Sequence, residues 1–192
     1  ENGDASGSGQ LVFSPDDRMY EVRSVTPIGY DLDVRLGGDG MIFIGTDRSI
    51  MAMRSDGTEL WSVNISNNWI GLVNDGTLRA CTSGQVSSFD PNGIMLWKTS
   101  IPGLNPYMAD PVISDTGRLF AGVDDRNDPT IKAGIVAIEP NGTIAWQFEG
   151  DGNISTDVAA SSDGRVYFIS SMYDDDHNTL FAVDNNGSQI WK

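Results

Sequence analysis

Short runs of β-branched and aromatic residues alternate with polar turns along most of this 192-residue chain. Many of the turns contain an Asp-Gly, Asn-Gly or Ser-Gly pair, in which glycine supplies the positive φ that a tight hairpin requires. No segment offers a convincing helical period over ten residues. The hydrophobic pattern therefore predicts an all-β protein built from short antiparallel strands.

One ten-residue pattern occurs four times in the chain. A small residue is followed two places later by a charged residue, then by Asp or Asn and Gly, and four residues after the glycine by Trp. The four copies occupy residues 52–61, 88–97, 137–146 and 182–191. Recurrence every few tens of residues, with one aromatic residue per period, indicates a repeat protein in which each unit buries its apolar face on its neighbours.

Each repeat divides into four strands. We predict first strands at residues 30–36, 69–73, 108–114 and 156–160, and second strands at residues 41–44, 77–81, 118–121 and 165–169. The ten-residue pattern supplies the third and fourth strands. Units of four strands and about 40–45 residues are typical of the blades of a β-propeller. The chain is therefore predicted to hold four full blades, at about residues 28–62, 63–98, 99–147 and 148–192.

The pattern has a physical explanation. The small residue ends the third strand where the neighbouring blade lies close, the glycine makes the turn, and the tryptophan covers the gap between successive sheets. A buried indole N–H also needs an acceptor, which a carbonyl group of the next blade can supply. We therefore predict a structural docking role for four tryptophans and four turn glycines: Trp61, Trp97, Trp146, Trp191, Gly57, Gly93, Gly142 and Gly187.

Residues 11–22 resemble the same pattern, with Tyr20 in the place of the tryptophan and one residue missing. We predict a partial blade over residues 11–27, preceded by a flexible linker over residues 1–10 that is rich in glycine and polar residues. Four blades and a fraction make an open arc or half-ring. The chain starts at Glu1 without an initiator methionine, which suggests a processed protein or part of a longer one. Self-association of two arcs or a longer parent protein is favoured over a small closed ring.

The segments 137–146 and 182–191 resemble the tryptophan-docking repeat of the PQQ-like, quinoprotein-type β-propellers, and the resemblance covers residues of about 28–192. This family includes pyrroloquinoline quinone dehydrogenases and also non-catalytic scaffolds, such as the outer-membrane lipoprotein of the barrel-assembly machine. The dehydrogenases use an adjacent cysteine pair, a Ca²⁺ site and a tryptophan at the centre of a full ring, whereas Cys81 is the single cysteine here. The resemblance therefore implies the non-catalytic branch, without a quinone cofactor.

Acidic residues outnumber basic residues by 27 to 12, which gives a formal net charge of -15. Such a surface repels polyphosphates and anionic lipids, so nucleic acid and bare membrane are poor partners. No apolar stretch approaches the roughly 20 residues that span a bilayer, so we expect no membrane insertion. Four glycosylation sequons fit a secreted history, and we expect an extracellular, cell-surface or periplasmic location. The candidate asparagines are Asn64, Asn141, Asn153 and Asn186.

In an antiparallel blade, the loop between the second and third strands emerges on the same side as the link to the next blade. That side collects loops whose alternating Asp, Asn and Ser oxygens are the ligand type that Ca²⁺ accepts. No glutamate follows at the spacing of an EF-hand, and solvated acidic loops are the alternative interpretation. The candidate Ca²⁺ ligands are Asp124, Asp128, Asp151, Asn153, Asp157, Asp174 and Asp176.

We expect a non-catalytic scaffold or protein-binding module, self-assembling through open blade edges, because uncovered blades expose apolar surface and unpaired strands. The single histidine, His177, lies in an acidic loop that favours its charged form, and Cys81 is expected to be a small buried residue. The alternative is a carbohydrate-binding or carbohydrate-active cell-surface protein that uses Trp69, Tyr107 and Tyr173 beside carboxylates. Exposed aromatic residues would favour this alternative, and aromatic residues buried between blades would favour the scaffold.

Overall fold

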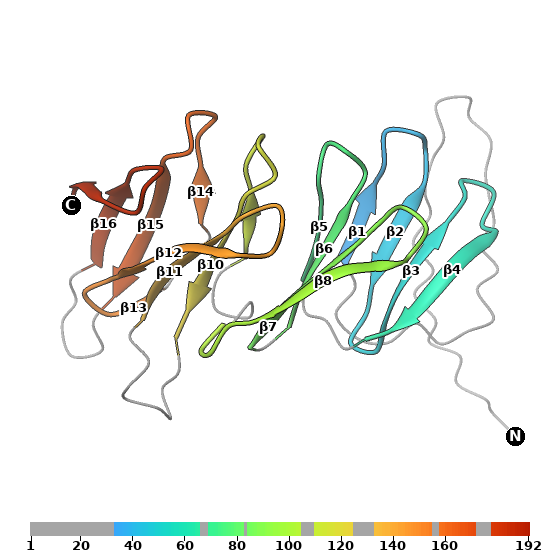
Figure 1. Cartoon of the computed structure of the whole chain (residues 1–192), viewed down its shortest axis with the longest axis horizontal. Coiled ribbons are helices and arrows are strands. Elements are labelled where there is room, and N and C mark those ends of the chain that lie inside the picture. The colour runs from blue at the N-terminus through green and yellow to red at the C-terminus, as the bar shows by residue number, and fades with distance from the viewer. Residues whose placement is uncertain are drawn as a thin grey trace, which may run out of the picture.

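The structure, a computed structural model, describes residues 33–65, 69–82, 84–104, 110–124, 133–154, 158–171 and 178–192. Every regular element in these ranges is a β-strand. The strands form four antiparallel sheets that follow one another in chain order, from the blue first sheet to the red fourth sheet (Figure 1). The predicted linker (1–10) and partial blade (11–27) lie outside the described residues.

Each of the first two sheets is a meander of four strands in chain order. The first sheet consists of β1 (Asp33–Leu36), β2 (Ile42–Gly45), β3 (Ser49–Met53) and β4 (Glu59–Asn64). The second sheet consists of β5 (Trp69–Leu72), β6 (Leu78–Thr82), β7 (Gln85–Phe89) and β8 (Met95–Ser100). In both sheets the first strand forms one edge, next to the first strand of the neighbouring sheet, and is called innermost. The fourth strand, which carries the repeated tryptophan, forms the opposite, outer edge.

The third sheet repeats this arrangement, and the fourth departs from it in one place. The third sheet consists of β9 (Val112–Ile113), β10 (Leu119–Val123), β11 (Gly134–Ile138) and β12 (Ile144–Glu149). The fourth sheet consists of β13 (Asn153–Ile154), β14 (Ala159–Ala160), β15 (Val166–Ser171), β16 (Asn178–Val183) and β17 (Gln189–Trp191). Both β13 and β14 pair with β15, so the innermost strand begins earlier than the predicted residues 156–160 and is formed in two pieces.

The hairpin between the third and fourth strands has the same geometry in every sheet. In the first sheet, the Arg54 amide donates to the Thr58 carbonyl at 2.9 Å, and the Gly57 amide donates to the Arg54 carbonyl at 3.0 Å. Gly57 has a φ of 85°, and the strand register shifts between Ala52 and Met53. These features define a type I turn followed by a glycine bulge, and they explain why the sequence pattern contains glycine at this place.

The core is divided into clusters that lie between consecutive sheets. The cluster between the first two sheets consists of buried side chains from both, namely Phe43, Ile50, Ala52, Ile70, Leu78, Ala80 and Phe89. Two further clusters lie between the second and third sheets and between the third and fourth. Because alternate residues of a strand face opposite ways, each inner sheet contributes to two clusters.

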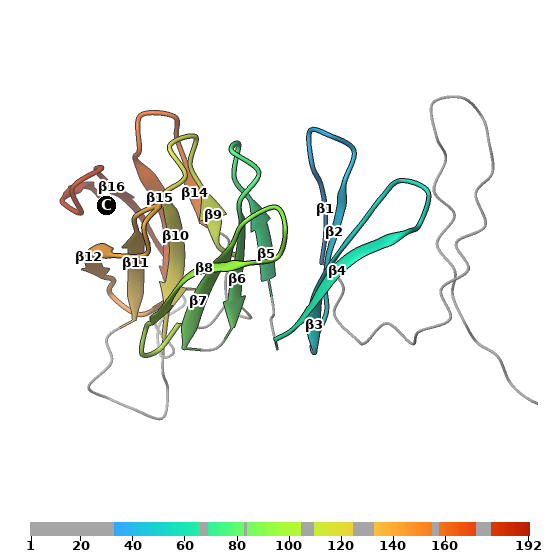
Figure 2. The ribbon, with the colours of Figure 1, turned by 45° about the vertical axis from the view of Figure 1, so that its right-hand side comes forward.

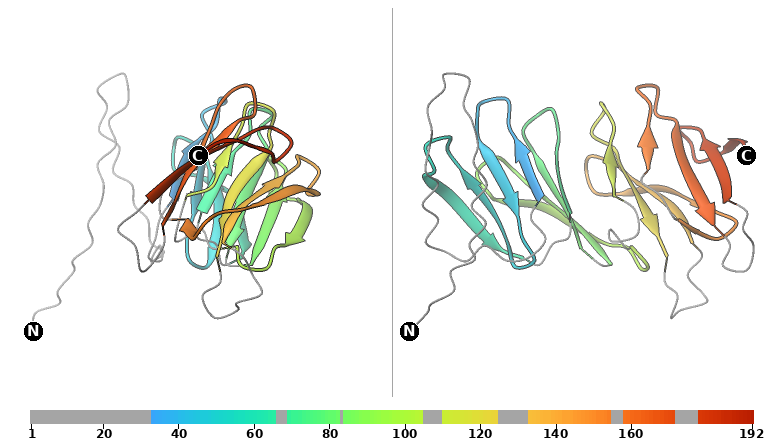
Figure 3. Two further views of the ribbon diagram at one scale, coloured as in Figure 1. Left: turned by 90° about the vertical axis from the view of Figure 1, so that its left-hand side faces the viewer. Right: turned by 180° about the vertical axis from the view of Figure 1, so that it is seen from behind.

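The sheets form an open row. The innermost strands lie against one another, β1 beside β5, β5 beside β9 and β9 beside β14. The Ile70 amide donates to Oδ2 of Asp33 at 2.9 Å and so links the first two sheets. Figure 2 and the right-hand view of Figure 3 show the first and fourth sheets at opposite ends of the row. The described residues therefore form an all-β stack of four antiparallel sheets, as the sequence predicted for the four full blades.

No helix long and apolar enough to cross a bilayer is present in the described ranges.

Candidate functional site

Each sheet carries a row of three side chains, which in the first three sheets faces the following sheet. The row contains one residue of the second strand, the small residue of the third strand and the tryptophan of the fourth, which are paired neighbours across the strands. The four rows are Phe43-Ala52-Trp61, Arg79-Ser88-Trp97, Phe120-Ala137-Trp146 and Tyr167-Ala182-Trp191. The central residues are fully buried. The small central side chain allows the two outer side chains to meet above it.

The two outer side chains of each row lie against each other, as a pair of rings in three rows and as a cation over an indole in the second. The ring centroids are 6.1 Å apart for Phe43 and Trp61 and 5.8 Å apart for Phe120 and Trp146. In the second sheet the place of phenylalanine is taken by Arg79, whose guanidinium carbon lies 5.0 Å from the centroid of Trp97. A cation above an indole face is an attractive arrangement. The flanking side chain thus packs against the tryptophan on its own sheet and helps to hold the ring in place.

Each of the first three repeated tryptophans donates a hydrogen bond to the turn of the next sheet. Nε1 of Trp61 donates to the Pro91 carbonyl at 2.8 Å, and Nε1 of Trp97 donates to the Pro140 carbonyl at 2.8 Å. The third indole, Trp146, donates to the Asn185 carbonyl at 3.0 Å. In each case the acceptor lies two residues before the turn glycine. The same contact, an indole on a hairpin turn, therefore joins every pair of consecutive sheets.

The turn glycine is required by the indole as well as by the backbone. A Cβ atom added to Gly93 would lie 2.7 Å from Trp61, and one added to Gly142 would lie 2.6 Å from Trp97. The corresponding distance from Gly187 to Trp146 is 2.8 Å. Contacts this short are not tolerated by a rigid ring, so any side chain at these positions would displace the tryptophan.

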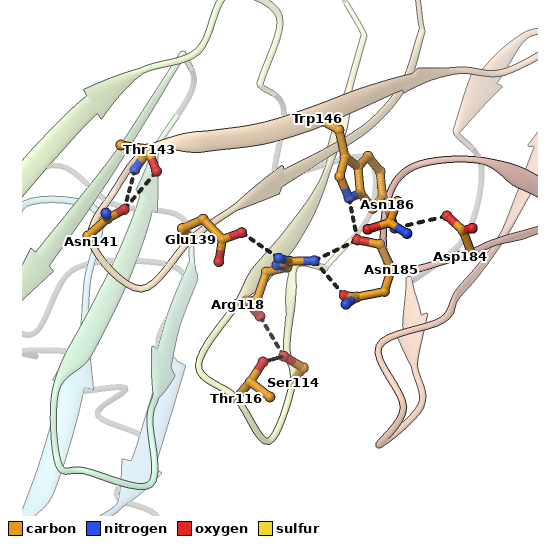
Figure 4. Close-up of polar contacts among 10 residues, drawn as sticks. All are labelled: Ser114, Thr116, Arg118, Glu139, Asn141, Thr143, Trp146, Asp184, Asn185 and Asn186. Atoms are coloured by element: carbon orange, nitrogen blue, oxygen red, sulfur yellow. Dashed lines mark hydrogen bonds and ion pairs between the residues drawn. The ribbon is translucent and has the colours of Figure 1, made fainter.

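An arginine strengthens the joint between the third and fourth sheets (Figure 4). Nη1 of Arg118 donates to the Asn185 carbonyl at 2.7 Å and to Asn185 Oδ1 at 2.5 Å, while Nη2 pairs with Oε1 of Glu139. The same Asn185 carbonyl therefore accepts hydrogen bonds from Trp146 and from Arg118. Since a carbonyl oxygen has two lone pairs, both bonds can form at once.

Arg79 has the equivalent role between the second and third sheets. Its Nη2 donates to the Pro140 carbonyl at 3.2 Å, the acceptor that also receives the Trp97 indole. Its Nη1 bonds to Ser88 Oγ and to Thr77 Oγ1. The residue is 3% exposed, so this buried cation depends on those partners.

Sequence reasoning missed both arginines. A signal for Arg79 was present, because the third residue after the glycine of the first turn is Phe43, Arg79, Phe120 and Tyr167 in the four repeats. The tryptophan pattern drew attention to the third and fourth strands, whereas the partner of each indole comes from the second strand.

Side-chain oxygens also hold the turns that receive the indoles, and in two of the three turns that oxygen belongs to an aspartate. Oδ1 of Asp90 accepts hydrogen bonds from the Ile94 amide at 2.8 Å and from the Asn92 amide at 2.9 Å. The bond from Ile94 is the main cause that holds the pKa of Asp90 below its ordinary value. The turn is therefore most stable with Asp90 ionised.

The joint is incomplete at both ends of the stack. At the far end Trp191 is 46% exposed, and no described residue accepts a hydrogen bond from its indole nitrogen. At the near end the turn over residues 54–57 has the same backbone geometry as the three occupied turns, and a Cβ atom at Gly57 would meet nothing within 4 Å. Trp191 and Gly57 were predicted to dock like their counterparts, but within the described residues neither has a partner sheet.

The two end faces carry apolar side chains. Val34 and Leu36 of β1 are 55% and 72% exposed on the near face, and Leu180 of β16 is exposed on the far face. The positions equivalent to Val34 and Leu36 in the second sheet are Ile70 and Leu72, which pack against the first sheet. The exposure at the ends therefore goes with the lack of a described sheet beside these residues and not with a change in the sequence pattern.

The candidate Ca²⁺ ligands are not assembled in the described residues. Asp124 is 8% exposed, and Oδ2 of Asp151 pairs with Nζ of Lys192 at 2.9 Å. No group of three potential metal ligands occurs in the part of the chain that the structure describes. The side chain of Asn153 is not described. The remaining candidates, Asp128, Asp157, Asp174 and Asp176, lie outside the described residues. Calcium binding stays a prediction.

Among the described residues, the aromatic side chains proposed to bind carbohydrate do not form an exposed surface on which a sugar could stack. Trp69 is 6% exposed and packs between the second and third sheets with Leu119 and Val123. Tyr107 and Tyr173 lie outside the described residues, as does His177. Cys81 is buried in the same cluster as Trp69, and burial raises the pKa of its thiol. A neutral, buried thiol is a poor nucleophile.

An open cavity of about 360 Å³ lies along the innermost strands of the first three sheets. It is lined by Arg35, Leu36, Trp69, Gly71, Leu72, Asp110, Pro111, Val112 and Ile113. Gly71 is needed here because a Cβ atom would lie 2.1 Å from the Trp69 ring. Arg35 and Asp110 are the charged members of the lining, and these side chains do not form a nucleophile with an adjacent base.

The sequon asparagines have different surroundings. Asn64, Asn141 and Asn186 are exposed, the first at the end of β4 and the other two in turns that receive an indole. Oδ1 of Asn141 accepts hydrogen bonds from the amide and the hydroxyl of Thr143 at 3.0 and 2.8 Å. Glycosylation at these positions stays a prediction.

Comparison with solved structures identifies the fold. The chain is similar to virginiamycin B lyase from Staphylococcus aureus, with a TM-score of 0.69, 12% identity, and coverage of 94% of this chain and 61% of the lyase. It is similar to the WD40 β-propeller domain of Doa1, with a TM-score of 0.57, 14% identity, and coverage of 78% of this chain and 49% of that domain. A protein of unknown function from Bacteroides caccae matches with a TM-score of 0.53, 14% identity, and coverage of 86% and 83%.

These likenesses confirm the predicted β-propeller fold class and, at this level of identity, they concern the fold alone. No family model matches the sequence, and no curated protein matches it. The chain spans about half to three fifths of the WD40 domain and of the lyase that it resembles.

Proposed function

We propose that this chain is a non-catalytic β-propeller scaffold that binds polypeptide through the two end faces of its stack. The observation that carries the proposal is the half joint at each end. Trp191 offers an indole without a described turn to receive it, and the turn over residues 54–57 offers an acceptor without a described indole. Elsewhere in the same molecule the indole binds a backbone carbonyl of a turn, and the turn receives a tryptophan side chain.

The chemistry of the ends suits a polypeptide partner. The far face offers an aromatic ring, an indole donor and apolar side chains, which three other sheets use to hold a hairpin turn. The near face offers a backbone carbonyl and apolar side chains, which suit a tryptophan on a β-strand. Aromatic anchors surrounded by apolar surface are typical of protein interfaces.

The repeat type and the location belong to the same proposal. The indole-to-turn contact at three joints supports membership of the PQQ-like propellers, whose repeats the sequence resembles. Exposed sequon asparagines at Asn64, Asn141 and Asn186 support an extracytoplasmic location. Burial of Trp69 supports the scaffold over a carbohydrate-binding role, since this ring is not available for stacking on a sugar.

Site-specific photocrosslinking in the cells that produce the protein tests this function. A photoreactive residue is placed at Leu36 on the near face, at Leu180 on the far face, and at the exposed outer-strand residue Gln147 as the matched control. The scaffold predicts polypeptide adducts at positions 36 and 180 and much weaker labelling at position 147. Equal labelling at all three positions, or adducts that contain no polypeptide, would contradict it.

A further inference from the structure

Three of the four hairpin turns between third and fourth strands carry an asparagine immediately before the turn glycine. These residues are Asn92, Asn141 and Asn186, and each of them is exposed. The residue two places later is, in the same order, Ile94, Thr143 and Ser188. Asparagine followed two residues later by serine or threonine is the acceptor sequence of N-glycosylation, so two of these equivalent asparagines are candidate acceptors and one is not.

The side chain of Asn141 is held by its oxygen and not by its nitrogen (Figure 4). Oδ1 accepts hydrogen bonds from the Thr143 amide at 3.0 Å and from the Thr143 hydroxyl at 2.8 Å. No described residue accepts a hydrogen bond from Nδ2 of Asn141. Nδ2 is the atom that receives the sugar in N-glycosylation, so attachment there leaves both bonds of the turn in place.

The turn between β3 and β4 shows that the amide nitrogen is not needed for this geometry. Asp56 has the place of Asn141 there, and its Oδ1 accepts a hydrogen bond from the Thr58 amide at 2.9 Å. A carboxylate offers oxygens and no amide nitrogen. Gly57 and Gly142 nevertheless have nearly the same φ, 85° and 88°. A substituent on the nitrogen of Asn141 therefore leaves the turn its required oxygen.

The exposed side of this turn is separate from the side that receives the indole. A Cβ atom added to Gly142 would lie 2.6 Å from Trp97, whereas Asn141 and Thr143, on either side of that glycine, are exposed. The Trp97 indole donates to the Pro140 carbonyl and not to the Asn141 side chain. A sugar on Nδ2 is therefore compatible with the joint between the second and third sheets.

The other two turns hold their asparagines in a different way. Oδ1 of Asp184 accepts hydrogen bonds from the amides of Asn186 and Ser188 at 2.9 and 2.8 Å. Asp90 does the same in the second sheet, where the turn has no sequon hydroxyl. Among these three described turns, only that of Asn141 joins the asparagine oxygen to both the amide and the hydroxyl of its sequon. Hydrogen bonds between residues two apart form locally, so this turn presents Nδ2 and the hydroxyl together.

We infer that Asn141 is a site of N-glycosylation, that Asn186 is a weaker site, and that the equivalent Asn92 is not modified. The sugar donor is an activated sugar diphosphate. Nδ2 gives an electron pair to the anomeric carbon of the sugar and loses one proton to a base of the transferase. The new C–N bond replaces the C–O bond to the diphosphate, which leaves with the electron pair of that bond. This inference rests on the extracytoplasmic location in the proposed function and adds a modification to it.

The test is mass spectrometry of peptides from the full chain, purified from the cells that produce it and fragmented by a method that keeps sugars attached. The expected result is a sugar on Asn141 in most molecules, severalfold lower occupancy at Asn186, and none at Asn92. Thr143→Ala and Asn141→Asp should each abolish modification at position 141 and leave that of Asn186 unchanged. Asn141→Asp keeps the turn oxygen, as in the turn of Asp56, so loss of the sugar in this variant does not come from a damaged fold.

Two further variants separate the sequon from the turn that holds it. Ile94→Thr creates a sequon at Asn92 and should add a sugar there at about the level of Asn186, because Asp90 still holds the amides of that turn. Thr143→Ser keeps the hydroxyl, so Asn141 should stay more occupied than Asn186. Equal occupancy of the two sites in Thr143→Ser would overturn the role of the turn.

An unmodified Asn141, or equal occupancy of Asn141 and Asn186 in the unchanged protein, would overturn the inference. If no sugar is found while photocrosslinks at Leu36 and Leu180 capture another polypeptide, glycosylation is excluded and the scaffold function stands. If Asn141 carries a sugar while the crosslinks contain no polypeptide, the modification stands and the scaffold function fails.

Discussion

Replacement of Gly142 by alanine tests whether indole-on-turn docking stabilises the stack. Gly142 has a φ of 88°, and an added Cβ atom would lie 2.6 Å from Cδ2 and 2.7 Å from Cε3 of Trp97. Gly40 is the matched control because its φ is 82°, its amide closes a turn of the same kind, and nothing lies within 4 Å of an added Cβ atom. The two substitutions share the backbone strain and differ in the clash with the indole.

The shared strain of an alanine in the left-handed region is about 1–2 kcal/mol. Gly142→Ala must also move the Trp97 ring, which disturbs packing at a cost of about 1–3 kcal/mol. Loss of the hydrogen bond to Pro140 adds about 0.5–1.5 kcal/mol. The free energy of unfolding should therefore fall by about 1.5–4.5 kcal/mol more for Gly142→Ala than for Gly40→Ala. The Tm should fall by roughly 3–18 °C more.

The assay is urea unfolding followed by circular dichroism and tryptophan fluorescence, with the three proteins at one low concentration. A third variant, Gly142→Ala combined with Trp97→Ala, checks the cause. If the clash is with the indole, the costs of the two changes will not add, because the second change removes the ring that the first displaces. Equal loss of stability in Gly142→Ala and Gly40→Ala would refute docking as a source of stability.

Three further predictions concern the polar groups of the joints. Trp61→Phe should lower the free energy of unfolding by about 1 kcal/mol more than Trp146→Phe, measured by urea unfolding, because an arginine still donates to the acceptor of the latter. Arg79→Phe should be strongly destabilising alone and at least partly restored by adding Ser88→Ala, since the pair then matches the Phe-Ala pairs of the first and third sheets. Asp90→Asn should reduce the loss of stability that the protein shows between about pH 5 and pH 2. The pKa of Asp90 is lowered in the folded state, so its stabilising effect is complete above the unfolded pKa near 4. This effect disappears as the pH falls through the folded pKa.

Each of these predictions has its own contrary result. Equal effects of the two tryptophan substitutions would show that the second donor to the Asn185 carbonyl contributes nothing. Additive costs in the double variant of the second sheet would mean that Arg79 and Ser88 do not act as a unit. An acid limb of the stability curve that is unchanged in Asp90→Asn, with the exposed Glu149→Gln as the control, would show that the turn carboxylate does not favour the folded state.

The sequence predicted the local structure well because the signals are local. Glycine at a positive φ fixes each turn, and the alternation of side chains fixes which residues face a neighbour. The second strands, predicted at residues 41–44, 77–81, 118–121 and 165–169, are observed as β2, β6, β10 and β15 with small shifts of their ends. The innermost strand of the fourth sheet was less predictable, since its two short pieces contain few of the apolar residues that mark a strand.

The pattern by itself determined that an indole, a small residue and a turn glycine recur together, and physical chemistry required an acceptor for each buried N–H. Only the tertiary structure decided which carbonyl accepts each indole N–H. It also showed that Arg79 shares the acceptor of one tryptophan, that Arg118 shares the acceptor of another, and that Trp69 is buried. The tertiary structure also distinguished Trp191 from the three tryptophans with the same sequence signature. The reason is that a repeat encodes one half of each joint within its own residues, whereas burial of that half depends on whether another sheet stands beside it.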